Sequence, residues 1–216
     1  MKRLYPLILI CIFITAALLP AFSWERVKNS GGITISVQKV EGSEIKEFMA
    51  VTVVESSLSS IIALLDDTKN YTSWNYRCSE AKLLYKKNDY ERITYMVTGS
   101  PWPVAERDIA VRSVISQDKS SGVVTVSLKG LPGYTSEMNG RVRMTSLRGY
   151  WRLEPLGGGN IRVIYRLHSE PGGSVPDSIV NSSLVDIPYN TLWNMRNFVK
   201  RSPYRDAVYT IVKEKK

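Results

Sequence analysis

Arg112 is the residue whose type and surroundings could bind a charged ligand. It lies in the stretch Pro101–Ile115, where two prolines prevent a regular strand in the first half because they remove backbone donors and fix φ. If Arg112 points inward, a cation lies among apolar neighbours, and a buried charge without a partner costs several kcal/mol. If it points outward, it is an ordinary solvated side chain. The second half alternates as a strand does and leaves both orientations open, with Ile109, Val111, Ser113 and Ile115 on one face and Asp108, Ala110, Arg112 and Val114 on the other.

Residues typical of enzymes are few. His168 is the single histidine, so a metal site built from several histidines is excluded, and a Cys-His nucleophile pair is not expected. Asp66 and Asp67 are adjacent and are expected to be solvated. The glycine runs 31–32 and 157–159 fit turns rather than phosphate-binding loops. We therefore expect no catalytic residue, no metal and no cofactor.

The N-terminus has the features of a secretory signal peptide. Two basic residues precede an uncharged, mostly apolar run, 4–19, and Ala21 and Ser23 place small residues at the −3 and −1 positions of a cleavage site. The apolar run contains a proline and is short for a membrane-spanning helix, which is the alternative. We expect residues 1–23 to be removed and the mature protein to be exported, to the periplasm in a bacterium and to the exterior otherwise.

The composition fits one globular domain with a surplus of positive charge. The chain has 216 residues, of which 44% are hydrophobic and 23% charged, and its formal net charge is +9. Removing residues 1–23 takes away Lys2 and Arg3 and leaves +7. Such a surplus fits nucleic acid or an anionic membrane surface as a partner, and export argues against nucleic acid. We expect a monomer that contacts membranes transiently, with simple solubility as the alternative reason for the charge.

Residues 24–203 are predicted to form a single α+β domain dominated by antiparallel strands. Alternating apolar residues between turn signals predict the strands, and helical spacing predicts two short helices after the first hairpin. The segment 24–30 fits either a short helix or an entry strand. The expected strands are 33–40, 45–54, 78–85, 91–98, 108–115, 123–128, 140–147, 150–155 and 161–170, and the expected short helices are 58–65 and 68–76.

One long helix follows the strands. Pro176 suits the first position of a helix, and apolar residues recur at helical spacing as far as Val199. The expected helix, 176–201, contains Pro188 near its middle, which predicts a kink because proline deletes a helical hydrogen bond. Residues 204–216 are expected to form a basic tail of little structure.

Three local signatures occur in a specific order. The first is Pro101-Trp102-Pro103 followed by Glu106-Arg107-Asp108-Ile109 and Val111-Arg112, the second is Tyr150–Pro155 before a glycine hairpin, and the third is Gly173–Asn181 with Asp186–Tyr189 and Leu192–Arg196 beyond it. Together they resemble the START domain, a lipid-transfer family of the helix-grip superfamily, over about residues 30–200. The resemblance implies a helix-grip fold, in which a curved antiparallel sheet wraps around the C-terminal helix and encloses a tunnel for one lipid.

The resemblance also implies that the strand arginine corresponding to Arg112 projects into this tunnel. In some sterol-binding members an acidic residue on the neighbouring strand pairs with it, but here the centre of that strand, 92–97, has no carboxylate. Arg112 would then be free to bind an anionic headgroup through its planar fork of donors. The other expected ligand-binding residues are Trp102, Ala110, Val114, Tyr165, Leu184, Thr191 and Met195, and a gate is expected at Pro188 with Leu131 and Tyr134 on the facing loop.

Three classes of function follow. The leading one is a non-catalytic protein that binds and transfers a lipid or another hydrophobic small molecule. A superfamily enzyme of the polyketide cyclase or aromatase type would use a similar tunnel, but the sequence offers no acid-base pair for it. An interaction module with a filled core would carry no ligand, and mass spectrometry of an organic extract would distinguish it.

Overall fold

The computed structural model describes residues 23–214 and has an α+β architecture. Its strands are β1 (Glu25–Ser30), β2 (Ile33–Val40), β3 (Ser43–Glu55), β4 (Cys78–Asn88), β5 (Glu91–Thr98), β6 (Glu106–Gln117), β7 (Val124–Leu131), β8 (Arg141–Arg143), β9 (Ser146–Gly157) and β10 (Asn160–Glu170). Its helices are α1 (Leu58–Asp66), the 3-10 turn η1 (Thr68–Asn70), α2 (Tyr71–Trp74) and α3 (Asp177–Phe198).

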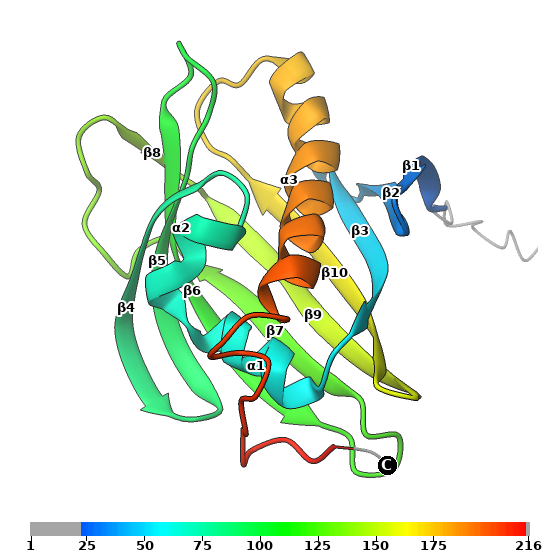
Figure 1. Cartoon of the computed structure of the whole chain (residues 1–216). Helices are drawn as coiled ribbons and strands as arrows, with labels where there is room; N and C mark the ends of the chain where they lie inside the picture. Colours follow the sequence, from blue (N-terminus) through cyan, green and yellow to red (C-terminus); the bar gives the residue numbers. More distant parts are fainter. Residues whose placement is uncertain (1–22, 215–216) are drawn as a thin grey trace, which may run out of the picture.

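Nine of these strands form one antiparallel sheet in the order β1-β2-β3-β10-β9-β7-β6-β5-β4, and β8 pairs in parallel with β6. Figure 1 shows α3 lying across the open side of the curved sheet, with α1 and α2 on the same side. This arrangement confirms the predicted fold class. The predicted signal peptide falls almost wholly outside the described residues. Within residues 23–214, no helix has the length and apolar character needed to cross a bilayer.

The predicted strand 140–147 is wrong in its extent. Only Arg141–Arg143 pairs with β6, and β9 begins at Ser146. Between them the chain changes partners, because Met144 N donates to the Asp108 carbonyl (3.0 Å) whereas Thr145 N donates to the Glu170 carbonyl (3.0 Å). The ambiguous segment 24–30 is strand β1.

Two glycines allow the sheet to bend. A Cβ added at Gly149 would lie 2.2 Å from the Arg166 carbonyl oxygen, and one at Gly130 would lie 2.6 Å from Ile109 Cδ1. Side chains at these positions would push neighbouring parts of the sheet apart, and glycine inside a strand commonly marks a close approach or a bend. The bend helps to create the hollow that α3 covers.

The C-terminal segment is part of the fold, which corrects the expectation of a tail of little structure. It contains no helix or strand up to residue 214, but Tyr204 and Val212 are buried. The Glu214 carboxylate accepts hydrogen bonds from Leu58 N (3.0 Å) and Ser59 N (2.8 Å) at the start of α1. A carboxylate there satisfies unpaired helical donors and favours the positive end of the helix dipole.

Candidate functional site

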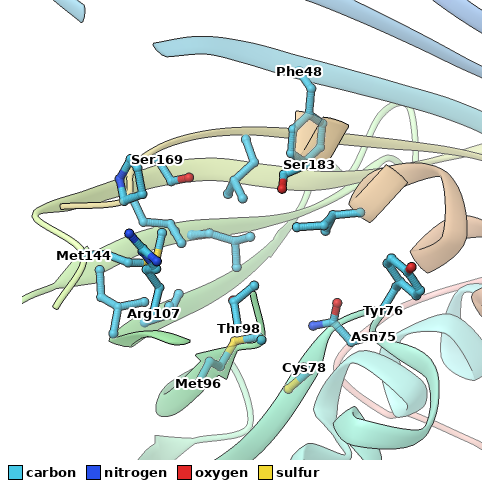
Figure 2. Close-up of a pocket in the computed structure, with 18 of the residues that line it drawn as sticks. Phe48, Asn75, Tyr76, Cys78, Met96, Thr98, Arg107, Met144, Ser169 and Ser183 are labelled. Carbon is cyan, nitrogen blue, oxygen red and sulfur yellow. The ribbon is translucent and has the colours of Figure 1, made fainter. Parts of the chain in front are cut away.

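The concave face of the sheet and the first half of α3 line a cavity that is partly open to solvent. Most of its wall is apolar, as expected for a site that holds a hydrophobic ligand. The sheet contributes Met96, Ile109, Val111, Leu147, Trp151 and Leu167, the connection between β8 and β9 contributes Met144, and α3 contributes Ile179, Val180, Ser183, Leu184 and Ile187. Figure 2 shows side chains from strands and helix converging on this space.

The residues that border the cavity are more exposed at one end than at the other. At the more exposed end the cavity is bordered by Gly99 and Ser100, on the loop between β5 and β6, and by Pro171 and Val175, on the loop before α3. These residues are half-exposed, whereas Leu65 and Trp74 at the other end are buried. We call these the open end and the deep end.

Arg107 places a positive charge in the wall near the open end. It is the second residue of β6, it is 6% exposed, and it lines the cavity. Its Nη1 donates to the Ala105 carbonyl (2.5 Å) and its Nη2 to the Ser174 carbonyl (3.4 Å), while its Nε has no hydrogen-bond partner. No side chain that the structure describes places a carboxylate within 4.0 Å of this guanidinium.

The electrostatic state of Arg107 follows from its burial. Burial lowers the pKa of Arg107 from its ordinary value, because an apolar environment disfavours the charged form. Arginine nonetheless stays protonated in proteins, so the cavity contains a cation whose charge is not neutralised by any described side chain. Figure 2 shows its guanidinium inside the cavity with Met144 beside it.

Arg112, the predicted anion ligand, points the other way. Its side chain is 44% exposed and its Nε donates to Glu91 Oε1 at 2.8 Å on the outer face of the sheet. The inward residues of β6 are Arg107, Ile109, Val111 and Ser113. Side chains of a strand alternate between its two faces. The prediction that Arg112 points inward therefore placed every residue of β6 on the wrong face of the sheet. Ala110 and Val114, predicted to lie beside Arg112 in the cavity, are outside it as well.

The other predicted positions divide into three groups. Tyr165 and Leu184 line the cavity as expected. Thr191 and Met195 are buried in the second half of α3, where Thr191 Oγ1 accepts from Tyr76 N (3.2 Å), and neither reaches the cavity. Trp102 is 93% exposed on the loop at the open end, so it is a surface residue and not part of the wall.

The three residues of the predicted gate lie in two different surroundings. Leu131 and Tyr134 do not line the cavity, whereas Gly99 and Ser100, on the loop between β5 and β6, do. Pro188 lies inside a continuous α3 and separates two parts of it. Every cavity-lining residue of α3 precedes Pro188, whereas Leu192, Met195 and Val199, which follow it, are buried in the main hydrophobic core. The gate at Pro188 stays a prediction.

A buried ion pair on the outer face was missed in the sequence. Asp108 is 1% exposed and accepts two hydrogen bonds from Arg143, from Nε at 3.0 Å and from Nη2 at 2.9 Å, and one from the Tyr95 hydroxyl at 2.8 Å. Arg143 also donates to the carbonyls of Thr135 (2.8 Å) and Ser136 (3.0 Å). This pair attaches the loop 132–140 to the sheet directly behind Arg107.

Cys78 and His168, the residues of a possible Cys-His pair, are not placed together. Cys78 lines the cavity, and burial raises the pKa of its thiol to about 11, which keeps it uncharged at neutral pH. His168 lies outside the cavity wall, buried beside β3, with its Nε2 3.2 Å from Ser43 Oγ and 3.2 Å from the Ile45 carbonyl. Cys78 and His168 therefore do not form a nucleophile-base pair that faces the cavity.

A curved antiparallel sheet, closed by a C-terminal helix over an apolar cavity, defines the helix-grip class. The family model described as START domain matches residues 8–204, which is most of the chain, so the chain belongs to the START-domain family. START domains bind hydrophobic, lipid-like ligands, and the family is mostly non-catalytic although it has cyclase relatives.

Two relatives in sequence have different degrees of similarity. An uncharacterised protein of Pseudomonas aeruginosa is 35% identical over 181 residues, which cover 84% of this chain and 89% of that protein. The phosphatidylcholine transfer protein of Rattus norvegicus is 23% identical over 177 residues, 79% of this chain and 81% of its own.

Solved structures agree with the fold. A fragment of a STAR-related lipid transfer protein from Xanthomonas axonopodis has a TM-score of 0.76 at 29% identity and covers 82% of this chain and 99% of its own. The human StAR-related lipid transfer protein 5 has a TM-score of 0.72 at 15% identity and covers 82% and 86%, which supports the fold alone.

Proposed function

We propose that this protein binds one anionic lipid in its cavity and transfers it between membranes without catalysing a reaction. The observation that carries the proposal is Arg107, a buried arginine in an apolar cavity with no described carboxylate partner. A buried charge is costly unless it is paired, and the planar fork of arginine suits a phosphate or carboxylate group. A lipid with an anionic group near the open end would supply the missing partner.

The apolar part of the cavity would hold the lipid's chain. At about 0.8 kcal/mol per buried methylene, exposing a sixteen-carbon chain to water costs on the order of 12 kcal/mol. A carrier removes this cost during passage through water. The first half of α3 supplies one wall of the cavity. A movement of this half about Pro188 would open the cavity and release the lipid chain. The rate at which the Pro188→Ala variant exchanges lipid between vesicles would measure the role of that hinge.

The test uses the purified protein and two membranes. An organic extract of protein prepared without added lipid should contain a lipid, identified by mass spectrometry. The protein should also accelerate the movement of a fluorescent anionic phospholipid or fatty acid from donor to acceptor vesicles. An empty extract together with no acceleration for either probe would contradict the proposal and favour an interaction module.

Trp102 is the expected membrane contact. It is 93% exposed on the loop at the open end, and tryptophan is enriched at membrane–water interfaces because its ring is amphipathic. We predict that Trp102→Ala slows vesicle-to-vesicle transfer several-fold and leaves the thermal midpoint unchanged. Tyr90→Ala is the matched control, because Tyr90 is an exposed aromatic residue in the turn before β5, whereas Trp102 follows the other end of that strand. Equal slowing by both variants would show that Trp102 has no special role.

Export to the periplasm is part of the same proposal and is supported by the N-terminal sequence alone. Intact mass of the protein from its host would show Trp24 as the first residue if the signal peptide is cleaved as predicted.

A further inference from the structure

Two further residues of the cavity wall carry a buried polar atom without a partner. Besides Arg107 Nε, these atoms are Thr94 Oγ1 and Trp74 Nε1, both buried and without a hydrogen bond to any described residue. Each side chain is 2% exposed. Buried polar groups in native proteins are nearly always paired, and leaving one unpaired costs about 1–3 kcal/mol. An unpaired group in a cavity wall therefore indicates a group of the ligand.

Both groups lie toward the deep end. On β5, Thr98 is opposite Arg107, and Thr94 is four residues farther along the strand, roughly 13 Å at ~3.3 Å per residue. Two residues beyond Thr94, Arg92 donates to the carbonyl of Leu65, which lines the deep end (3.1 Å).

Trp74 reaches the same end of the cavity from α2. Its carbonyl accepts from Asn194 Nδ2 (2.9 Å) in the second half of α3, and its ring lies 6.4 Å, centroid to centroid, from that of Trp151. The backbone of Trp74 is thus attached to α3, and its ring lies next to the Trp151 ring of the sheet.

We propose that Thr94 and Trp74 form a second polar site, which binds an oxygen atom on the chain of the lipid. This inference rests on the proposed function and adds to it the class of ligand. An indole N–H only donates and a threonine hydroxyl donates or accepts, so together they suit a hydroxyl or carbonyl oxygen. The ligand is then a lipid with an anionic group near Arg107 and an oxygenated carbon roughly 13 Å away, in the middle of its chain.

The experiment compares octadecanoic acid with hydroxyoctadecanoic acids that carry the hydroxyl group near the carboxylate, in mid-chain or at the methyl end. The unmodified protein should bind the mid-chain form more tightly than octadecanoic acid, by roughly threefold to tenfold for one or two net hydrogen bonds. Thr94→Val and Trp74→Phe each remove one polar group and keep the bulk. Both variants should retain affinity for octadecanoic acid and lose most of the preference.

Thr52→Val is the matched control. Thr52 is equally buried but lies outside the cavity wall, where its Oγ1 donates to the Gly32 carbonyl (2.9 Å). It should lower the thermal midpoint and leave the preference intact, whereas Thr94→Val should leave the midpoint unchanged or higher because no protein hydrogen bond is lost.

The outcomes separate the two proposals. If octadecanoic acid binds through Arg107 but mid-chain hydroxylation gives no advantage, or if the preference survives in both variants, the second polar site is wrong and the proposed function stands. If none of these acids binds, both proposals fail for this class of lipid.

Discussion

Arg107→Met should weaken binding of an anionic lipid by roughly tenfold to a hundredfold and leave binding of a neutral lipid nearly unchanged. The loss corresponds to about 1.5–3 kcal/mol, the contribution of a hydrogen bond to a charged group. Methionine keeps an unbranched side chain of similar length and fits an apolar wall. The variant should have a thermal midpoint close to that of the parent protein, because removing a buried charge that has no carboxylate partner offsets the loss of its hydrogen bonds to the Ala105 and Ser174 carbonyls.

Arg112→Met is the matched control for this experiment. Arg112 lies five residues farther along β6 but faces outward and pairs with Glu91, so its loss should change neither anionic nor neutral binding. Titration of both variants with fatty acid and with an uncharged lipid, followed by fluorescence or calorimetry, measures the difference. An equal loss of both lipids in Arg107→Met, or a loss in Arg112→Met, would exclude Arg107 as the headgroup ligand.

The elements of the fold could be predicted from local patterns, because each strand alternates and each helix has its own spacing. The strands 33–40 and 91–98 have the predicted bounds, and α1 starts at Leu58 as predicted, after its Ser57 cap. These features depend on residues close in sequence. The extent of 140–147 was wrong because the change of partner at Thr145 depends on Glu170, which is far along the chain.

The site could be predicted only as far as its general position. The sequence placed β6 beside the cavity, but both faces of this strand carry apolar residues, so alternation alone did not choose between them. A signal was available in the apolar residues of the two faces, because one face carries Ile109, Val111 and Ile115 whereas the other carries only Ala110 and Val114, and isoleucine and valine are buried more often than alanine. That comparison favours Arg107 over Arg112 as the inward cation.

The burial of Asp108 is the second reason why the face of β6 that carries Arg112 was wrongly predicted to line the cavity. A carboxylate on one face of a strand suggests that this face is wet, yet Asp108 is buried on the outer face, where it pairs with Arg143 of β8, 35 residues farther along the chain. Neither Arg143 nor Tyr95 can be assigned to Asp108 from spacing. The sheet therefore has polar groups buried on both sides of β6, and only the three-dimensional arrangement shows which one is already paired.

Removal of Arg143 should cause the largest loss of stability. Arg143 is 7% and Asp108 1% exposed, so Arg143→Met leaves a buried carboxylate without its cation, at a cost of about 3–5 kcal/mol. For a chain of this size that lowers the thermal midpoint by about 6–20 °C. Arg112→Met again serves as the control, since it breaks an exposed pair on the same strand and should change the midpoint little. Equal shifts in the two variants would show that the buried pair stabilises no more than an exposed one.

The pH dependence of this loss gives an independent check. Burial alone raises the pKa of Asp108, but the hydrogen bonds from Arg143 and Tyr95 outweigh burial and hold the pKa below its usual range. Because the pKa of Asp108 is lower in the folded protein than in the unfolded chain, the ionised carboxylate stabilises the fold. This stabilisation is complete above the unfolded pKa of about 3.9 and is lost as the pH falls through the lower pKa of the folded protein. Without Arg143 the pKa of Asp108 should rise, so the variant gains stability relative to the parent protein when Asp108 is protonated.

The difference in thermal midpoint between parent and Arg143→Met should therefore be largest near neutral pH and should shrink below about pH 4. A difference that stays constant down to the acid limit would mean that Arg143 acts through packing of the loop 132–140 and not through the charge of Asp108.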